Sequence, residues 1–282
     1  MHSVCPSRKA LTLKLVRAFA ALLFAPAASA GMAEDWRYSI GVHDFVVPDA
    51  NSHTYGLNGG GSMDKRTDSG LHLFGSFDIF LDVDRDHLDS DHILLRGEFH
   101  FGSDGDWWRS NRMHVGWTAD VDTKENTVSA IERQITAFPA FVAGYDGQAF
   151  QASLEAGAGW FFLELDDDAP REQGYDRNTL VNSTFAYAAT ARLTLRLGES
   201  WTLSGRARGW WDGHRSLESQ YQAVLRVDAR SWLGGGSLKQ PALLLSADYY
   251  KYNLDVYNRP DPPPILHWNE DLTIRLSLEA RW

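Results

Sequence analysis

Apolar and polar residues alternate along most of this 282-residue chain, and this period of two constrains the fold more than any other feature. Between residues 71 and 83 the odd positions are apolar or glycine, whereas the even positions include His72, Asp78 and Asp82. Successive side chains of a strand point to opposite sides, so the alternation predicts strands that separate two unlike environments. The sequence therefore predicts an all-β protein. The same alternation recurs at 93–101, 113–121, 150–162, 185–197, 201–211, 221–229, 243–249 and 272–282.

Strand length distinguishes a soluble β-sandwich from a membrane barrel. Strands of soluble proteins average about five or six residues, whereas a tilted strand needs about 9–11 residues to cross a bilayer. The runs at 150–162 and 185–197 exceed that length. Charges recur on the polar face, where a closed lumen holds them as ion pairs or hydrated groups. We predict an antiparallel, transmembrane, up-and-down β-barrel.

Tryptophan placement supports the membrane interpretation. The chain has 11 Trp residues, and indole prefers the boundary between lipid and water. A barrel that spans a membrane is expected to carry one aromatic belt at each interface. We assign to these belts Trp36, Trp117, Trp160, Trp201, Trp211, Trp232 and Trp282.

The predicted strand count is twelve, with ten as the alternative. Twelve strands require that residues 127–145 form two strands joined by a tight turn near Ile135, whereas a short helix there leaves ten. Long external loops and short periplasmic turns are expected to alternate along the chain. We place the external loops near 48–68, 103–109, 165–179, 213–218 and 255–267. We place the short turns near 84–91, 122–126, 145–148, 198–200 and 233–239.

The N-terminal segment is typical of a secretory signal peptide. Residues 1–30 combine basic residues, an apolar run at 18–27 and the small residues Ala28-Ser29-Ala30 at a cleavage position. The alternative, a transmembrane helix, needs about 20 apolar residues, and this run is shorter. We expect cleavage near Ala30, which leaves residues 31–282 as the barrel domain. The only cysteine of the chain, Cys5, lies in this segment, so a disulfide framework and a Cys-based zinc site are excluded.

The mature chain resembles bacterial outer-membrane β-barrel proteins, which carry an export signal, lack cysteine and end on an aromatic residue. Its last segment, 269–282, is similar to the C-terminal signal of that class, with Arg275 at a polar position and Trp282 at an apolar one. It departs from the usual pattern at Ser277, where glycine is common. The resemblance implies a location in the bacterial outer membrane, contact with lipids and lipopolysaccharide, and recognition of the last strand by the barrel-assembly machinery. We expect a monomer.

The net charge of −10 argues against a nucleic-acid partner, because phosphate neutralisation needs a basic surface. Two functions suit the charged inner face. One is a narrow pore for small solutes or ions, in which inward arginines guide anions. The other is a structural envelope barrel whose lumen is plugged by side chains and salt bridges. The residues predicted to line the lumen are Arg96, Glu98, Glu155, Arg192, Arg196, Arg206, Arg208 and Arg226.

A third hypothesis is a lipid or acyl ester hydrolase. His214 and Ser216 resemble the His-x-Ser pair of outer-membrane phospholipase A and the lipid A deacylases, in which a third polar residue follows at a spacing that here selects Asp228. Ser, His and Asp would serve as nucleophile, base and orienting group. Two features oppose this: Leu217 stands where Asn is usual, and strand parity directs the three residues to the lumen instead of the lipid.

The sequence predicts no cofactor and no metal site. Residues 82–91 are rich in aspartate, which suggests calcium at first. An EF-hand loop that begins at Asp82 requires Gly at its sixth position and Glu at its twelfth. Those positions hold His87 and Ile93, so the motif fails.

Overall fold

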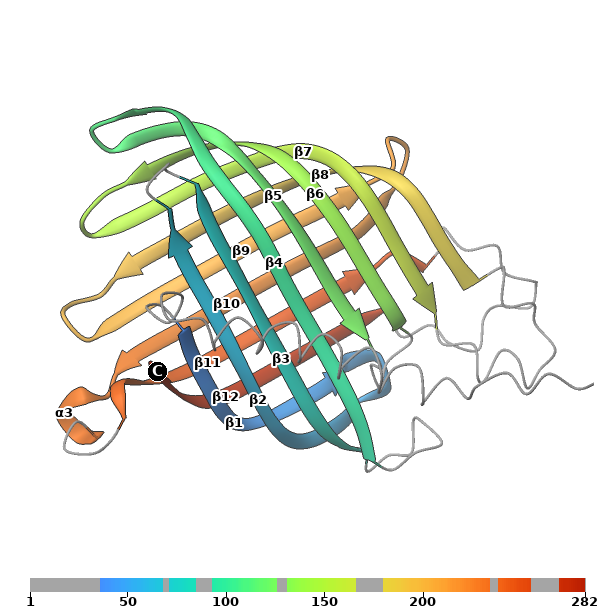
Figure 1. Ribbon diagram of the computed structural model, residues 1–282. Coiled ribbons are helices and arrows are strands. Elements are labelled where there is room, and N and C mark those ends of the chain that lie inside the picture. The colour runs from blue at the N-terminus through green and yellow to red at the C-terminus, as the bar shows by residue number, and fades with distance from the viewer. Residues whose placement is uncertain are drawn as a thin grey trace, which may run out of the picture.

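The computed structural model describes residues 36–67, 71–84, 93–125, 131–165, 180–233, 238–254 and 269–281, which form a closed barrel of twelve antiparallel strands (Figure 1). Each strand pairs with its neighbours in chain order, and β1 pairs with β12 to close the barrel. The strands are β1 (Trp36–Val47), β2 (Ser52–Arg66), β3 (His72–Asp84), β4 (Ile93–Ser110), β5 (Met113–Glu125), β6 (Ile131–Asp146), β7 (Phe150–Leu165), β8 (Val181–Arg196), β9 (Trp201–Trp211), β10 (Ser216–Asp228), β11 (Lys239–Tyr252) and β12 (Glu270–Arg281).

Helical structure in the described part of the chain is limited to two short turns. These are η2 (Pro48–Ala50), between β1 and β2, and α3 (Arg230–Leu233), between β10 and β11. Within the described ranges, no helix is both long enough and apolar enough to cross a membrane.

The outer wall of the barrel is apolar and the inner wall is largely polar. Ile40, Phe141 and Leu154 are 69%, 68% and 67% exposed on the outside. Along β8 the outward Phe185 is exposed, whereas the inward Thr190 is buried. Such apolar exposure all round a closed barrel suits lipid as the surrounding solvent. The predicted transmembrane β-barrel and its twelve strands are confirmed.

The strand count is right although two of the strand assignments that gave it were wrong. Residues 52–66, all of which fall in the external loop predicted near 48–68, form β2, and residues 131–146 form one strand, β6. The glycines at 59–61 give the sequence of β2 a loop-like composition, yet Gly60 pairs with both Ser39 and Asp78. Ile135, the expected turn, pairs with β5 and β7. A missed strand and a divided strand therefore cancelled in the count.

Because the prediction omits β2, it assigns several of the following connections to the wrong end of the barrel. We call the end where β1 starts and β12 finishes the terminal end, and the opposite end the loop end. The predicted turns at 145–148, 198–200 and 233–239 fall at the terminal end, as expected, and the one at 213–218 falls at the loop end. Residues 103–109, predicted as a loop, lie inside β4.

Other predicted connections also moved. The short turns predicted near 84–91 and 122–126 were expected at the terminal end. However, β3 and β5, the strands before them, both finish at the loop end. The loops predicted at 165–179 and 255–267 lie almost entirely outside the described residues.

Candidate functional site

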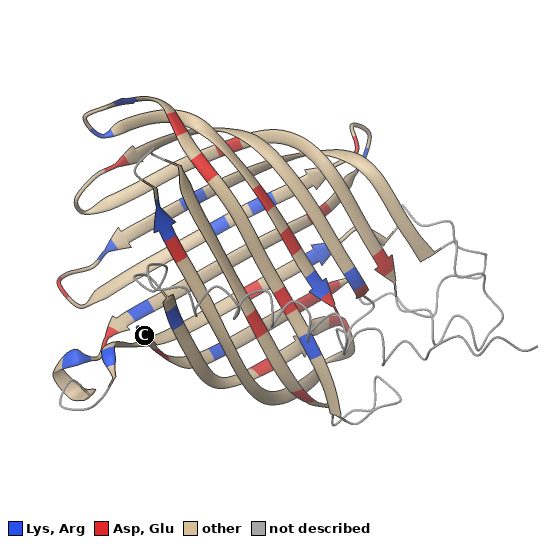
Figure 2. Cartoon of the chain, in the orientation of Figure 1, with Lys and Arg blue, Asp and Glu red and all other residues tan. Residues whose placement is uncertain are grey.

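Two adjoining polar cavities occupy the lumen from the terminal end to its middle. The first, here called the vestibule, has a volume of about 400 Å³, and the second, the central chamber, about 200 Å³. Both are lined by His100 and Arg192, so they adjoin. Charged residues lie on strands all round the barrel (Figure 2). The vestibule is lined by residues that include Asp64, His72, Asp104, Arg109, His114 and Glu155. The chamber is lined by residues that include Asp78, Lys124, Arg206, Arg208, Asp248 and Arg275.

A lysine crosses the lumen beside the central chamber. Lys124 lies on β5, and its Nζ donates hydrogen bonds of 3.0 Å to both carboxylate oxygens of Asp271 on β12 and to the hydroxyl of Tyr252 on β11. These strands stand on nearly opposite walls of the closed barrel. The Lys124 and Asp271 side chains are almost fully buried. The interaction therefore joins two walls across a region shielded from water.

A second set of contacts crosses the lumen from β9. The guanidinium group of Arg208 donates to Asp120 at 2.5 Å and to Asp122 at 2.6 Å, both on β5. Gln134 on β6 likewise donates a hydrogen bond to the Glu218 carboxylate on β10. Hydrogen bonds to charged groups are stronger than neutral ones, so these contacts hold the facing walls together.

One group of donors in the described residues has the spacing of metal ligands. Donor atoms of His100, Asp120 and Asp122 all lie within 4.8 Å of one another. The Arg208 guanidinium group already contacts both carboxylates and supplies the compensating positive charge. We assign no metal to this group.

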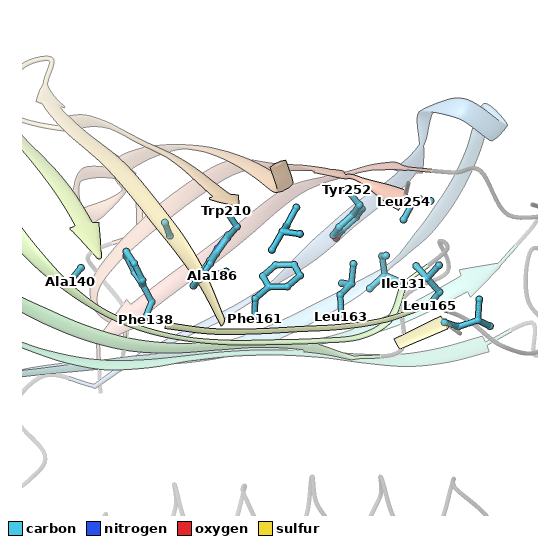
Figure 3. Close-up of a cluster of buried hydrophobic side chains, with 13 residues drawn as sticks. Ile131, Phe138, Ala140, Phe161, Leu163, Leu165, Ala186, Trp210, Tyr252 and Leu254 are labelled. Atoms are coloured by element: carbon cyan, nitrogen blue, oxygen red, sulfur yellow. The ribbon is translucent and has the colours of Figure 1, made fainter. Parts of the chain in front are cut away.

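A cluster of buried apolar side chains from β6 to β11 lies on one side of the lumen toward the loop end (Figure 3). The Trp210 ring lies 5.1 Å from the ring of Phe138 and 5.7 Å from that of Phe161, measured between centroids. All three are almost fully buried, and Trp210 also borders the central chamber. We call the whole group the apolar cluster: Ile131, Phe138, Ala140, Phe161, Leu163, Leu165, Leu180, Ala186, Ala188, Trp210, Leu217, Tyr252 and Leu254.

The residues predicted to line the lumen lie on inward strand faces. Arg96 is fully buried and donates to Asp82 at 3.2 Å and to Glu98 at 2.8 Å. Arg192 donates to Glu155 at 2.5 Å. Arg196 lies at the terminal end of β8, and Arg226 forms an ion pair with Glu279. Arg206 and Arg208 line the central chamber.

The sequence analysis missed the residues that bridge the lumen. Lys124, Asp271 and Tyr252 were not among the candidates. Their inward parity was visible, since Lys124 lies two and four positions from Asp122 and Asp120, and Asp271 lies four positions from Arg275. Parity gives the face of a strand but does not identify the partner across the barrel.

The predicted interface tryptophans lie at both ends of the barrel. Trp36 and Trp201 begin their strands and Trp232 lies in α3, all at the terminal end. On the outer face near the loop end, Trp160 and Trp211 are 43% and 38% exposed. Trp117 pairs with Gly105 in the terminal half of β5, and Trp282 lies outside the described residues.

The structure does not bring the proposed hydrolytic residues together. Ser216 is the first residue of β10 and Asp228 the last, so roughly 40 Å of extended strand separates them at about 3.3 Å per residue. Asp228 instead accepts hydrogen bonds from Arg230. The prediction of a His214–Ser216–Asp228 triad was wrong, because a triad requires hydrogen-bond contact. The spacing would need a hairpin between residues 216 and 228, and the strand continues without one.

His214 lies in the turn before β10. The Asp212 carboxylate accepts the backbone N–H groups of His214 and Arg215, each at 2.8 Å. These hydrogen bonds lower the pKa of Asp212 below its ordinary value. A register shift between Ser216 and Glu218 turns Leu217 into the apolar cluster and leaves Ser216 exposed. The local geometry stabilises a turn.

We expect Ser216→Ala to leave unchanged any phospholipid hydrolysis that the refolded barrel displays. Among the described residues, none donates to or accepts from the Ser216 hydroxyl as a base would, so this hydroxyl lacks a base to activate it. A fluorescent phospholipid in mixed micelles measures the rate, and Ser219→Ala on the same strand is the matched control. A fall of about a hundredfold or more with Ser216→Ala alone, as for loss of a nucleophile, would contradict this expectation.

Comparison with known proteins gives a likeness to solved barrels and no family. No protein-family model matches the chain, and no curated protein matches it. The NanC porin structure is 9% identical with a TM-score of 0.49, over 87% of this chain and 100% of that one. The KdgM porin is 6% identical with a TM-score of 0.43, over 86% and 99%. The outer-membrane phospholipase of Salmonella typhi is 9% identical with a TM-score of 0.44, over 87% and 90%. We transfer no residue role from these proteins.

Proposed function

We propose that this chain forms a narrow pore for small polar solutes or ions in the bacterial outer membrane. The observation that carries the proposal is the pair of adjoining polar cavities, which lead from the terminal end to the middle of the lumen. Charged and hydrogen-bonding walls replace part of the hydration shell of a solute that enters such a lumen. The cross-lumen contacts and the apolar cluster form the constriction between the central chamber and the loop end.

The proposed location follows from the two walls of the barrel and from the N-terminal segment. The apolar outer wall faces lipid and lipopolysaccharide. Residues 1–30 act as a signal peptide that is cleaved near Ala30, and residues 31–282 reach the membrane as a monomer. The barrel-assembly machinery recognises the alternating strand β12. The terminal end then faces the periplasm and the loop end faces outward.

Conductance in planar bilayers tests the pore directly. We expect residues 31–282, refolded and checked by heat-modifiable gel mobility, to give discrete current steps at several salt concentrations. Steps smaller than those of an open porin are expected, because side chains from facing walls meet in the lumen. A folded protein that gives no steps, and no swelling of liposomes in small sugars or amino acids, would contradict the proposal.

A structural barrel with an occluded lumen is the second candidate. Buried contacts between facing walls favour it, namely Lys124 with Asp271 and Arg208 with Asp120. Such contacts stiffen a barrel without transport. This function predicts that the protein gives no current steps in the bilayer and that cells without the protein have a detergent-sensitive envelope. The conductance measurement therefore separates the two candidates.

A further inference from the structure

The central chamber contains one cation, Arg206, that forms no direct ion pair with the described residues. Arg206 lines the chamber from β9, yet its guanidinium group makes no hydrogen bond or ion pair with the described part of the chain, and its Nε is buried without a partner. A buried donor without a partner is costly. The other basic residues of the chamber are all paired: Lys124 with Asp271, Arg192 with Glu155, Arg208 with Asp120 and Asp122, and Arg275 with Asp78 and Asp248.

The acids that line the chamber are already engaged by other groups. Asp122 is held by His100 at 2.5 Å and by Arg208 at 2.6 Å. Glu218 accepts a hydrogen bond from Gln134. The remaining acids have their own partners, which are Arg275 for Asp78, Arg96 for Glu98, and Arg275 and Gln222 for Asp248.

A second guanidinium group stands directly opposite Arg206. Arg192 on β8 is its cross-strand partner, and both residues line the chamber. Like charges directly opposite each other destabilise a pair of strands. Glu155 neutralises only one of the two, since Arg192 holds it with hydrogen bonds of 2.5 and 3.3 Å. An anion between the two arginines would remove this repulsion.

We propose that the central chamber binds a small oxyanion, a carboxylate or a phosphate, at Arg206 beside Arg192. The planar fork of a guanidinium group matches the oxygens of either anion. Gln222, which pairs with Arg206 from β10, lines the chamber on the other side. A volume of about 200 Å³ accommodates an anion of a few heavy atoms. The site goes beyond the proposed function, because equilibrium binding does not require conduction.

Arginine side-chain NMR tests the site with inorganic phosphate and with acetate as separate probes. The refolded chain carries ¹⁵N-arginine, each anion is titrated at constant ionic strength, and the Nε–H signal of Arg206 is identified by its loss in Arg206→Gln. We expect a saturable shift of the Arg206 and Arg192 signals with at least one anion. Phosphate alone or acetate alone would identify which oxyanion the chamber selects. No saturable shift with either anion would overturn the proposal.

Variants distinguish binding at this site from general attraction of anions by the positive charges of the lumen. Followed on the Arg192 signal, Arg206→Gln is expected to weaken binding about tenfold or more, whereas Arg206→Lys keeps the charge and weakens it less. Arg37→Gln is the matched control, because Arg37 is an inward arginine that binds Glu279 and lines neither cavity. Unchanged binding in Arg206→Gln, or an equal loss in Arg37→Gln, would overturn the proposal. Heat-modifiable mobility verifies that each variant is folded, and Arg206→Lys provides the comparison where Arg206→Gln does not refold.

Discussion

Replacing Phe138, Phe161 and Trp210 together by alanine is expected to raise the single-channel conductance by roughly fivefold or more, because apolar constrictions exclude water and ions. The Trp210 ring lies 5.1 and 5.7 Å from the other two rings and is almost fully buried. The three rings belong to the apolar cluster on one side of the lumen, between the central chamber and the loop end. Their removal is expected to widen the path for water and ions beside the central chamber, and planar-bilayer recording measures the result.

The neighbouring Trp211 provides the matched control. It points outward and is 38% exposed, so Trp211→Ala removes an equally large ring without widening the lumen. Each buried aromatic replaced by alanine costs about 3–5 kcal/mol of stability, and Trp210→Ala alone serves where the triple variant does not refold. A folded triple variant with wild-type conductance would show that the constriction lies elsewhere.

Lys124→Met is expected to lower the free energy of unfolding by about 3–5 kcal/mol, the usual effect of removing one partner of a buried ion pair. The change preserves most of the side-chain volume but removes the ammonium group that pairs with the buried Asp271 carboxylate, while the Tyr252 hydroxyl still donates to it. Urea unfolding in lipid vesicles measures the loss. Adding Asp271→Asn removes the buried carboxylate charge and is expected to recover most of the stability.

Lys251→Met is the control for the buried lysine. Lys251 pairs with Glu270 on the outer wall, and its side chain is 55% exposed. Exposed pairs contribute about 0–1 kcal/mol, so this variant is expected to unfold almost like the wild type. Equal losses for the two lysines would mean that burial of the Lys124 pair has no energetic consequence.

Alternation alone predicted the barrel and the direction of its charged side chains, because a period of two reports the two faces of a strand. It did not predict that the segments around Gly60 and Ile135 are continuous strands. Composition suggested a loop at the first and a turn at the second, but both residues pair with strands on either side. Pairing by two neighbours decides whether such a segment is a strand, and this is not a local property of sequence.

The contacts across the lumen were beyond prediction for a related reason. Lys124 and Asp271 are separated by 147 positions, and their meeting depends on the stagger of every intervening strand. The triad prediction failed for the opposite reason. Ser216 and Asp228 are close in sequence, but a continuous strand holds them far apart.

The bridge from β5 to β12 links the inside of the barrel to the order in which the chain is made. The Asp271 carboxylate belongs to the last strand, which also closes the barrel against β1. Until that strand is in place, Lys124 lacks the carboxylate with which it forms its ion pair, and Asp78 lacks the bond that it receives from Arg275. A chain released before its final strand therefore has both an open seam and unbalanced internal charge. Closure of the wall and pairing of these buried charges therefore depend on the same last strand.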